Sequence, residues 1–523
     1  MSGNSTYYVT TPIYYVNDVP HIGHAYTTLA CDVLARFKRL DGYDVHFLTG
    51  TDEHGQKIET AAAAAGLPPQ AFTDKVSQSF RDLIGVMNYS PDNFIRTTEP
   101  RHYAACQALW EKLVAAGDIY EGKYAGWYSV RDETYFVEGE TEVGPDNKRR
   151  ATSTGAEVQW VEEPSYFFRL SAWADRLLEY YEKNPAFIGP DSRRNEVMSF
   201  VKGGLQDLSV SRTSFSWGIP VPGNEKHIMY VWLDALTNYI TECGYPDQSN
   251  PLWKYWPANL HMVGKDIIRF HCVFWPAFLM AASLPPPQRV FAHGWWTNEG
   301  QKISKSLGNV IDPVDLVKTY GLDQVRYFLL REVPFGQDGN YSHEAIVTRI
   351  NADLANDLGN LAQRSLSMIA KNLEGKAPQL QNLLPQDEAI LALADALPEK
   401  CRHLMQNFAL HQILGEIWRV VAEANRYFAT EEPWIIRKTD QARFEVILAV
   451  TSEVLRAVAI MTQPVMPVAC TKLLDLLGVP DSARDFSQVG AKGRQDGGRL
   501  LPAPSGLFPR YVEEETAAQD TKA

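Results

Sequence analysis

Two short segments of the chain combine residue types that bind phosphate groups. The first is His21-Ile-Gly-His24, which immediately precedes a run with helical periodicity. The free backbone amides and the dipole at a helix N-terminus favour an anion, Gly23 allows close approach to the backbone, and imidazoles can donate hydrogen bonds to phosphate oxygens. Taken alone, four such residues favour an ordinary turn with two surface histidines.

The second segment is Lys302-Ile303-Ser304-Lys305-Ser306, which lies in a loop that follows a predicted strand and Gly294. Two lysines spaced by three residues form a cationic clamp. Such a clamp suits a pyrophosphate leaving group, on which negative charge builds during nucleotidyl transfer. Taken alone, this segment favours a solvated basic loop.

The elements around these segments predict an α/β fold with a parallel sheet. Tyr7 to Thr11 is a strand, Leu29 to Leu40 has apolar residues at helical spacing, and Val45 to Thr49 is a second strand. The same order of strand, helix and strand returns over residues 260–263, 267–282 and 289–292. Ligands bind beyond the carboxyl ends of parallel strands, so the polar clusters that follow these four strands point to one shared site.

Changes in pattern divide the chain further. Short β-like runs with turns indicate an inserted subdomain over 117–210, and leucine-rich helical repeats after residue 346 indicate a helical bundle. We predict six segments: 1–116 and 211–300 as the two halves of a Rossmann-like domain, 117–210 as the insertion, 301–345 as the lysine-loop region, 346–480 as the bundle, and 481–523 as a tail that wraps or frays.

Composition excludes several classes of protein. The 523 residues are 45% hydrophobic and 11% aromatic, which excludes a disordered or fibrous chain. The net charge of −13 argues against nonspecific coating of nucleic acid. Six scattered cysteines and an N-terminus without signal-peptide character fit a reducing, cytoplasmic location. The most apolar stretch, 270–284, is too short to span a membrane, so no membrane association is expected.

The two phosphate-binding segments together carry a family resemblance. H-I-G-H after the first strand and K-I-S-K-S after the last resemble the two signature motifs of class I aminoacyl-tRNA synthetases, with Ile303 in place of the usual Met. To about residue 470 the chain resembles the methionyl-tRNA synthetase family in particular. The stretches that carry this resemblance are residues 11–17, 47–55, 217–222, 230–235, 270–276 and 425–434.

This resemblance implies roles for individual residues. It implies catalytic roles for His21, His24, Lys302 and Lys305. It implies methionine binding by Ile13, Tyr15, Asp52, Trp232, Ala235, Tyr239, Ile267, His271 and Trp275. It implies ATP binding by Asn17, His21, Gly23, His24, Gly264, Asp266, Gly294, Ile303 and Lys305.

The residues themselves support part of this assignment. Ile267, His271 and Trp275 are spaced by four and share one helix face. An aromatic and aliphatic pocket suits a polarizable thioether. Core packing is the alternative for the two tryptophans, and capping of the next turn is the alternative for Asp52.

The resemblance further implies activation of L-methionine by ATP with Mg²⁺, followed by transfer to tRNA(Met), both initiator and elongator. The helical bundle would bind the anticodon through Asn360, Arg364 and Trp434, because RNA loops are read by stacking and by hydrogen bonds to base edges. An exposed polar helix face and a buried Trp are the alternatives. In an acidic chain, tRNA binding must rest on local cations, for which the lysine loop, Lys148 to Arg150 and Arg364 are the candidates.

Two departures from the family pattern carry further expectations. Tyr128 to Tyr135 replaces a cysteine knuckle, so neither structural zinc nor any other metal site is expected. The chain ends soon after the bundle, which favours a monomer. Three alternative functions fit less well. The synthetases for isoleucine, valine and leucine need a larger insertion, and the cysteinyl synthetase needs zinc ligands. A catalytically inactive paralogue would have damaged motifs, whereas both motifs are intact here.

Overall fold

The computed structural model describes residues 5–17, 19–303 and 308–513. The chain divides into two compact units. The first unit comprises residues 1–35 and 43–295, and the second comprises residues 36–42 and 296–523. No helix among the described residues is both long enough and apolar enough to cross a membrane.

The first unit is built on a seven-stranded sheet in which every pair of neighbouring strands is parallel. The strand order is β10-β16-β15-β1-β3-β2, and β4 pairs with β3. The strands are β1 (Thr6–Thr10), β2 (Tyr14–Tyr15), β3 (Asp44–Asp52), β4 (Asn93–Arg96), β10 (Ile188–Gly189), β15 (Leu260–Gly264) and β16 (Val290–His293). The α/β class and the parallel sheet predicted from the sequence are confirmed.

Strand β1 joins the two halves of the sheet. Val9 pairs with Phe47 of β3 on one side and with Leu260 of β15 on the other. The first and last parts of the unit therefore meet in one sheet although more than 200 residues separate β3 from β15. Strand β3 is buried from Val45 to Asp52, polar residues included, because parallel strands are covered on both faces.

Helices of the first unit connect and cover these strands. Helix α1 follows β2, and Gly42, at φ +86°, comes two residues after its end and fits the chain reversal into β3. Helices α4 and α7 pack against each other in a core that also contains Tyr8, Leu48 and Phe278. The helices are α1 (Ile22–Leu40), of which the residues to Ala35 belong to this unit, α2 (Gln56–Ala64), α3 (Pro69–Val86), α4 (Pro100–Ala115), α5 (Ala174–Lys183), α6 (Asp191–Lys202), α7 (Val231–Thr241) and α8 (Trp275–Ala281).

The predicted helix over 267–282 is not one continuous α-helix. A 3₁₀ turn (Lys265–Ile267) is followed by a π-helical turn (Phe270–Phe274) and only then by α8. Pro276 explains the break, because it has no N–H to donate to the carbonyl of Cys272. That carbonyl instead accepts a hydrogen bond from Tyr181 Oη at 2.6 Å. Such π-helical turns are frequent at functional sites.

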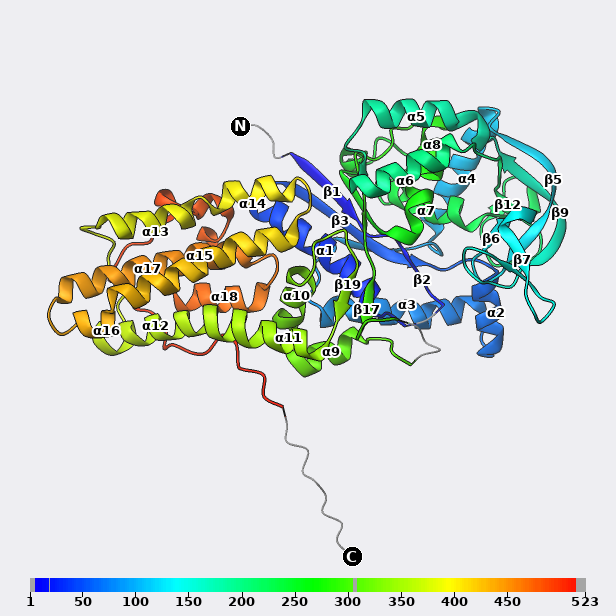
Figure 1. The fold of residues 1–523 in the computed structure, drawn as a ribbon. Helices are drawn as coiled ribbons and strands as arrows, with labels where there is room; N and C mark the ends of the chain where they lie inside the picture. Colours follow the sequence, from blue (N-terminus) through cyan, green and yellow to red (C-terminus); the bar gives the residue numbers. More distant parts are fainter. Residues whose placement is uncertain (1–4, 18, 304–307, 514–523) are drawn as a thin grey trace, which may run out of the picture. The chain divides into compact units, whose positions relative to one another are not determined.

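The insertion contains a small antiparallel sheet and a hairpin. Strand β9 (Gln159–Phe168) pairs with β5 (Ile119–Ser129), which also pairs with β6 (Thr134–Phe136); these strands are the cyan ribbons in Figure 1. Strands β7 (Thr141–Val143) and β8 (Arg149–Ala151) form the hairpin. The prediction of short strands throughout 117–210 is wrong over the two helical stretches that follow β9, α5 (Ala174–Lys183) and α6 (Asp191–Lys202). Helices α5 and α6 follow, and β10 between them pairs with β16 of the main sheet.

Short strands complete the first unit before α7. Strand β11 (Leu208–Ser209) pairs with β9, and β12 (Ser211–Arg212), β13 (Pro220–Val221) and β14 (Asn224–Met229) form a separate three-stranded sheet.

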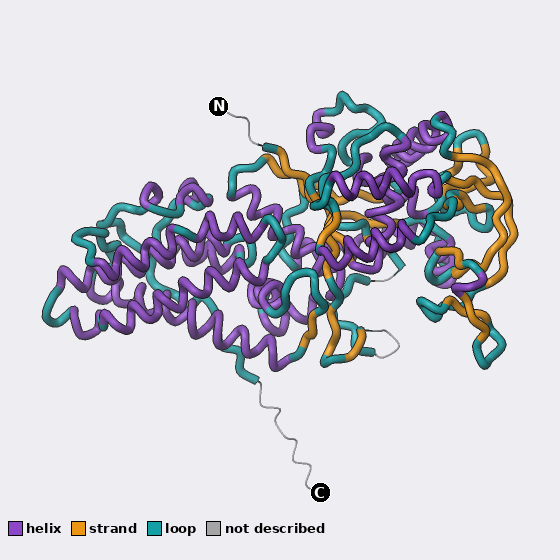
Figure 2. Tube along the Cα trace, turned by 45° about the horizontal axis from the view of Figure 1, so that its top comes forward, coloured by secondary structure: helices purple, strands orange, loops and turns teal. Residues whose placement is uncertain are grey.

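The second unit is mainly helical (Figure 2). A three-stranded sheet of β17 (Trp296–Asn298), β18 (Gln301–Lys302) and β19 (Gly339–Tyr341) precedes the bundle, in which α15 and α17 pack along each other. The helices are α9 (Pro313–Tyr320), α10 (Leu322–Arg331), α11 (His343–Arg349), a π-helical segment (Ile350–Gly359), α12 (Asn360–Asn372), α13 (Pro385–Asp395), α14 (Leu397–Met405), α15 (Leu410–Glu431), α16 (Pro433–Ile436), α17 (Gln441–Thr462) and α18 (Pro467–Leu476).

The described part of the tail wraps around this unit. Arg494 pairs with Asp395 of α13 at 2.9 Å, and the backbone N–H of Tyr511 donates to Asn351 Oδ1 at 2.8 Å. Of the two alternatives for the tail, wrapping and fraying, these contacts correspond to wrapping for the described residues.

Candidate active site

A cavity of about 490 Å³ opens at the carboxyl ends of the main strands, wholly within the first unit. The residues after β1, the last residue of β3, the residues after β15 and the last residue of β16 all contribute to its wall, so the four strand ends do share one cavity. The predicted site residues that line it are Ile13, Tyr15, His21, Gly23, His24, Asp52, Trp232, Ala235, Tyr239, Gly264, Asp266, Ile267 and His271.

The first phosphate-binding motif forms the start of α1. His21 precedes the helix, and its Nδ1 accepts a hydrogen bond from the backbone N–H of Gly23 at 3.0 Å. His24 Nδ1 accepts from the backbone N–H of His21 at 3.1 Å. Both Nδ1 atoms are therefore acceptors, and each neutral ring carries its proton on Nε2. Gly23 leaves room for the His21 ring, because a Cβ at this position would lie 2.9 Å from His21 Cε1 and displace the ring.

Both imidazoles are neutral at physiological pH. Burial lowers the pKa of His21, and burial together with the neighbouring His21 ring lowers the pKa of His24 well below its usual range. The two rings lie 3.9 Å apart between centroids. They therefore provide two neutral N–H donors for an anion, and positive charge must come from other groups.

Asp52 places a carboxylate in the wall at the end of β3. Its side chain is 7% exposed, and its Oδ1 is buried without a hydrogen-bond partner among the described residues. Burial, and then the charges of Asp234 and Glu133, raise the pKa of Asp52 well above its usual range. An unpaired buried carboxylate oxygen is costly, and a cationic ligand group would compensate for that cost.

The aromatic wall comes from α7 and the π-helical turn. Tyr239 Oη lies 2.6 Å from His271 Nε2, and His271 Nδ1 lies 3.0 Å from the carbonyl oxygen of Ile267. Nδ1 must donate to that carbonyl, so Nε2 accepts the Tyr239 hydroxyl proton. Trp232 stacks on Phe270 with centroids 3.7 Å apart. The Tyr239 hydroxyl and both ring nitrogens of His271 are thus hydrogen bonded, and the wall presents a largely apolar surface.

Three predicted site residues of the first unit do not line the cavity. Trp275 is completely buried behind it and donates from Nε1 to His261 Nε2 at 3.3 Å, which matches the core-packing alternative. Asn17 and Gly294 do not line the cavity either. Tyr15, close to Asn17 in sequence, does line it, as do His293 and Trp295 on either side of Gly294.

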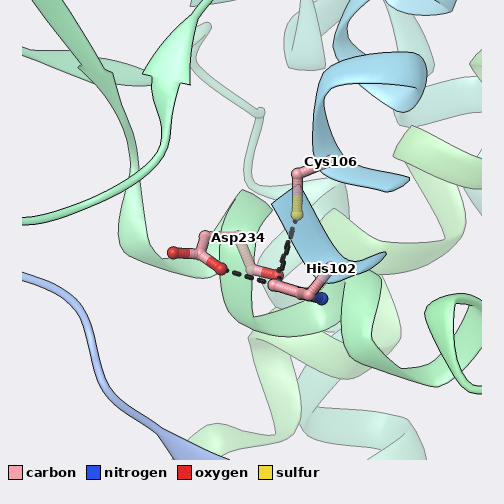
Figure 3. A group of neighbouring side chains, drawn as sticks. All are labelled: His102, Cys106 and Asp234. Carbon is pink, nitrogen blue, oxygen red and sulfur yellow. Dashed lines mark hydrogen bonds and ion pairs between the residues drawn. The ribbon is translucent and has the colours of Figure 1, made fainter. Parts of the chain in front are cut away.

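A buried polar network is centred on Asp234 of α7, and Figure 3 shows its His102 and Cys106 members. Asp234 accepts hydrogen bonds from His54 Nδ1 at 2.6 Å and from His102 Nε2 at 2.7 Å, and Cys106 Sγ lies 3.7 Å from its carbonyl oxygen. Burial raises the pKa of Asp234, but the two histidines outweigh burial and lower it to about 2. His102, Cys106 and Asp234 are metal-binding residue types with donor atoms within 4.8 Å of one another, and hydrogen bonds account for this arrangement. The network ties the end of β3 to α4 and α7.

The rim of the cavity at Asp266 contains residues that sequence reasoning missed. Trp295 Nε1 donates to Asp266 Oδ1 at 3.2 Å, and Lys265 Nζ lies 4.3 Å from the Trp295 ring centroid. Thr27 and His293, also in the wall, are hydrogen bonded at 2.7 Å. His293 directly follows the predicted strand 289–292 and is the last residue of β16, and its position at a strand end is the signal that could have identified it.

The insertion also contributes to the wall, which the sequence did not indicate. Arg131, Asp132 and Glu133, in the turn between β5 and β6, line the cavity together with Lys57. This turn belongs to the segment 128–135, for which the sequence predicted no zinc site, and it offers no thiolate. All six cysteines are free and buried elsewhere. The residues of this turn therefore do not fit a cysteine-ligated zinc site.

The basic triplet of the insertion is neutralised by acidic partners. Lys148 pairs with Glu157 at 2.8 Å, and Arg149 pairs with Glu138 at 2.7 Å. Arg150 pairs with Asp146. Each of these three cations forms an ion pair with an acidic side chain of the insertion, which weakens the expectation that they attract tRNA.

In the second unit, Lys302 ends strand β18 and is exposed. Its carbonyl oxygen accepts from Asn309 Nδ2 at 3.0 Å, and the carbonyl oxygen of Asn309 accepts from Asn298 Nδ2 at 2.9 Å. These bonds close the base of the lysine loop. Ile303 is half-buried, and Lys305 lies outside the described residues.

The three predicted anticodon residues form a small group in the same unit. The guanidinium carbon of Arg364 lies 5.3 Å from the Trp434 ring centroid and 5.0 Å from that of Phe428. Asn360, one turn before Arg364 on α12, is exposed. Arg364 and Trp434, 70 residues apart in sequence, thus form a stacked cation–π pair beside an exposed amide.

Comparison with known proteins identifies the family. The family described as "tRNA synthetases class I (M)" matches residues 7–366, and the "Anticodon binding domain of methionyl tRNA ligase" matches residues 378–522. A methionine–tRNA ligase of Brucella suis is 62% identical over 97% of this chain and 98% of its own length, and one of Mesorhizobium japonicum is 59% identical over 98% and 99%.

A solved structure agrees with these sequence matches. The Mycobacterium tuberculosis methionyl-tRNA synthetase in complex with methionyl-adenylate superimposes with a TM-score of 0.95 at 56% identity, covering 97% of this chain and 100% of that one. With a family match over more than half of the chain and relatives of this identity over nearly all of it, the chain belongs to the methionyl branch of the class I tRNA synthetases.

Proposed function

We propose that this chain activates L-methionine with ATP and transfers the methionyl group to tRNA(Met), using the cavity of the first unit for both reactions. The observation that carries the assignment of the site is the unpaired, buried Asp52 carboxylate oxygen beside an aromatic wall. Within one part of the cavity, the carboxylate suits an ammonium group and the aromatic wall suits an unbranched apolar side chain. Methionine has both.

In the bound state, the methionine ammonium would pair with Asp52. The thioether would lie among Ile13, Trp232, Ala235, Tyr239, Ile267 and His271, with Tyr15 closing one side and Trp275 supporting the wall from behind. The hydrogen bond between Tyr239 and His271 occupies the hydroxyl proton of Tyr239, so this polar pair does not compete for the thioether, which is a weak acceptor.

ATP would occupy the half of the cavity at the start of α1. The Nε2–H groups of His21 and His24 donate to phosphate oxygens, Gly23 allows their close approach, and Asn17, two residues after the end of β2, contributes a further polar group. Gly264 and Asp266 would hold the ribose, and Gly294 and Ile303 would lie near the adenine. Lys302 and Lys305 supply positive charge for the phosphates. Mg²⁺, bound to ATP as co-substrate, neutralises part of the phosphate charge.

The chemistry needs no nucleophile or general base from the protein. A methionine carboxylate oxygen bonds to the α-phosphorus of ATP, the bond from that phosphorus to the bridging oxygen breaks, and pyrophosphate leaves. A ribose hydroxyl of the terminal adenosine of tRNA then attacks the mixed anhydride, giving methionyl-tRNA and AMP. The protein acts by positioning and by stabilising charge on the phosphates.

The second unit would recognise tRNA. Arg364 and Trp434 offer stacking surfaces, and Asn360 offers an amide for base edges, so residues 346–480 would bind the anticodon of initiator and elongator tRNA(Met). We propose 117–210 as a connective-peptide subdomain that folds without zinc, 301–345 as the region that contacts the tRNA stem, and a monomer that acts in the cytoplasm.

Charging of tRNA tests this proposal. Purified protein is incubated with ATP, Mg²⁺, labelled methionine and either tRNA(Met) or a tRNA with a different anticodon. We expect acid-precipitable methionyl-tRNA, with one AMP formed per methionine transferred, only with tRNA(Met). Equal charging of both tRNAs, or none of either, would contradict the proposal.

A further inference from the structure

The turn between β5 and β6 brings a buried carboxylate of the insertion into the cavity. Glu133 is 9% exposed and lines the cavity together with Arg131 and Asp132. Its Oε1 accepts a hydrogen bond from Tyr15 Oη at 2.5 Å and a longer one from the backbone N–H of Lys57 at 3.4 Å. One side chain therefore joins the insertion to β2 and to the first turn of α2.

Several features show that this contact is specified by its surroundings. Glu133 has φ +48°, in the left-handed region that non-glycine residues seldom adopt. Gly55, which precedes α2 with φ +114°, leaves room for the contact, because a Cβ there would lie 2.8 Å from Glu133 Oε1 and 2.9 Å from Tyr15 Oη. Backbone strain and a buried carboxylate persist only where the structure around them enforces both.

The charge of Glu133 is supported on two sides. The N-terminus of α2 favours a negative charge next to the N–H of Lys57, and the Lys57 ammonium lies 5.4 Å from the Tyr15 ring centroid. Burial raises the pKa of Glu133, while its bonds with Tyr15 and Lys57 oppose that shift. The Tyr15 ring is therefore fixed at its hydroxyl by Glu133 and contacted on its face by Lys57.

We infer that Glu133 is a positioning residue for methionine, which acts by holding Tyr15 as the wall of the amino-acid end of the cavity. This inference rests on the proposed function, since it assigns that end of the cavity to methionine. It gives the insertion a role in substrate binding, because the turn without cysteines contributes the group that orients a pocket residue. Glu133 acts through Tyr15, so the hydroxyl of Tyr15 and the carboxylate of Glu133 should behave as one functional unit.

Steady-state methionine-dependent exchange of pyrophosphate into ATP tests this in the full-length protein. We compare Glu133→Ala, Glu133→Gln, Tyr15→Phe and the double variant Glu133→Ala/Tyr15→Phe. Glu142→Gln, on exposed strand β7 of the same insertion, is the matched control. KM for methionine, KM for ATP and kcat are measured with the melting temperature of each variant.

We expect Glu133→Ala and Tyr15→Phe each to raise KM for methionine about tenfold, the effect of losing one hydrogen bond to a charged group, while KM for ATP and kcat change less than about twofold. The double variant should be no worse than either single variant, because both remove the same bond. Glu133→Gln keeps an acceptor oxygen and should restore KM to within about twofold of the parent.

Other results would overturn the inference. Multiplying effects in the double variant would show that the two residues act independently. A fall in melting temperature with unchanged KM for methionine, or with equal rises in both KM values, would show a purely structural contact. If Glu133→Ala does not fold, Tyr15→Phe alone decides, since it removes only the hydroxyl. Failure of the proposed function is recognised separately, because the parent itself would then show no methionine-dependent exchange.

Discussion

Tyr239 Oη and His271 Nε2 lie 2.6 Å apart in the wall of the cavity, one on α7 and the other on the π-helical turn. Burial lowers the pKa of His271 to about 4, so the ring is neutral near pH 7 and Nε2 is available to accept the phenol proton. Helix α7 and the π-helical turn, about 30 residues apart in sequence, thus form one wall. The Tyr239 hydroxyl and His271 Nε2 in this wall satisfy each other by a hydrogen bond.

Replacing Tyr239 with Phe should weaken methionine use. The change leaves His271 Nε2 buried without its donor, which costs about 1–3 kcal/mol. We therefore expect kcat/KM for methionine to fall about 5- to 150-fold, measured by pyrophosphate exchange, with KM for ATP unchanged. Tyr43→Phe, outside the cavity wall, is the control. A Tyr239→Phe variant with parental kcat/KM would contradict this account of the wall.

Replacing Asp52 with Asn should stabilise the fold and abolish activation. Because burial and neighbouring carboxylates raise the pKa of Asp52, its contribution to stability is present in full below the unfolded pKa and is lost as pH rises through the folded pKa. The neutral amide of Asp52→Asn does not ionise, so the variant keeps the stability that the parent loses as pH rises. At pH 7 we expect the variant to melt about 1–3 °C higher than the parent, with no such gain at acidic pH.

The same Asp52→Asn variant should lose the partner of the methionine ammonium, and kcat/KM for methionine should fall at least about 100-fold. Asp82→Asn, exposed on α3, is the matched control for both measurements. A less stable variant at pH 7 or one with unimpaired exchange would refute the role given to Asp52.

Removing Lys305 should slow adenylate formation without weakening methionine binding. The ammonium stabilises charge on the leaving pyrophosphate, and loss of such a group costs about 10²–10³ in rate. We expect that loss in single-turnover adenylation for Lys305→Ala and for Lys302→Ala, with unchanged methionine affinity by equilibrium binding. Lys318→Ala, which changes an exposed side chain on α9, should behave like the parent. Comparable adenylation rates in all variants would exclude the clamp.

Removing Trp434 should separate charging from activation. Loss of the stacking between an RNA base and the Trp434 ring costs about 1–3 kcal/mol of binding free energy. The Arg364 guanidinium also loses its cation–π contact with that ring. We expect charging of tRNA(Met) to fall about 5- to 150-fold with pyrophosphate exchange unchanged. Arg426→Ala, exposed on α15 of the same bundle, is the control. If Trp434→Ala only lowers the melting temperature and charges normally, Trp434 is a packing residue.

Periodicity and strand-end placement predicted much of the fold and the position of the site. The strands around Val9, Phe47 and Leu260 were recognised because parallel strands form short apolar runs, and their polar ends do line one cavity. The boundaries were less accurate: β3 continues to Asp52, past the predicted end at Thr49, because polar Thr49 and Thr51 are buried within it.

Contacts between distant segments could not be predicted from periodicity. The contact of Glu133 with Tyr15 joins residues 118 positions apart through a turn with no apolar pattern. Trp275 has the spacing of a wall residue, but the π-helical turn before Pro276 and the bond to His261 place it behind the wall. Spacing by four identifies one face of a helix, and it does not distinguish the residues in contact with a cavity from those beneath them.

Pyrophosphate exchange across the full panel of amino acids tests the central claim most directly. The protein is incubated with ATP, Mg²⁺, labelled pyrophosphate and each amino acid in turn, and label entering ATP is measured. The unpaired Asp52 oxygen beside the Tyr239–His271 wall predicts exchange with methionine at least about 100-fold above isoleucine, leucine, valine and cysteine. Exchange with another of these amino acids equal to that with methionine, or exchange with none, would contradict the account.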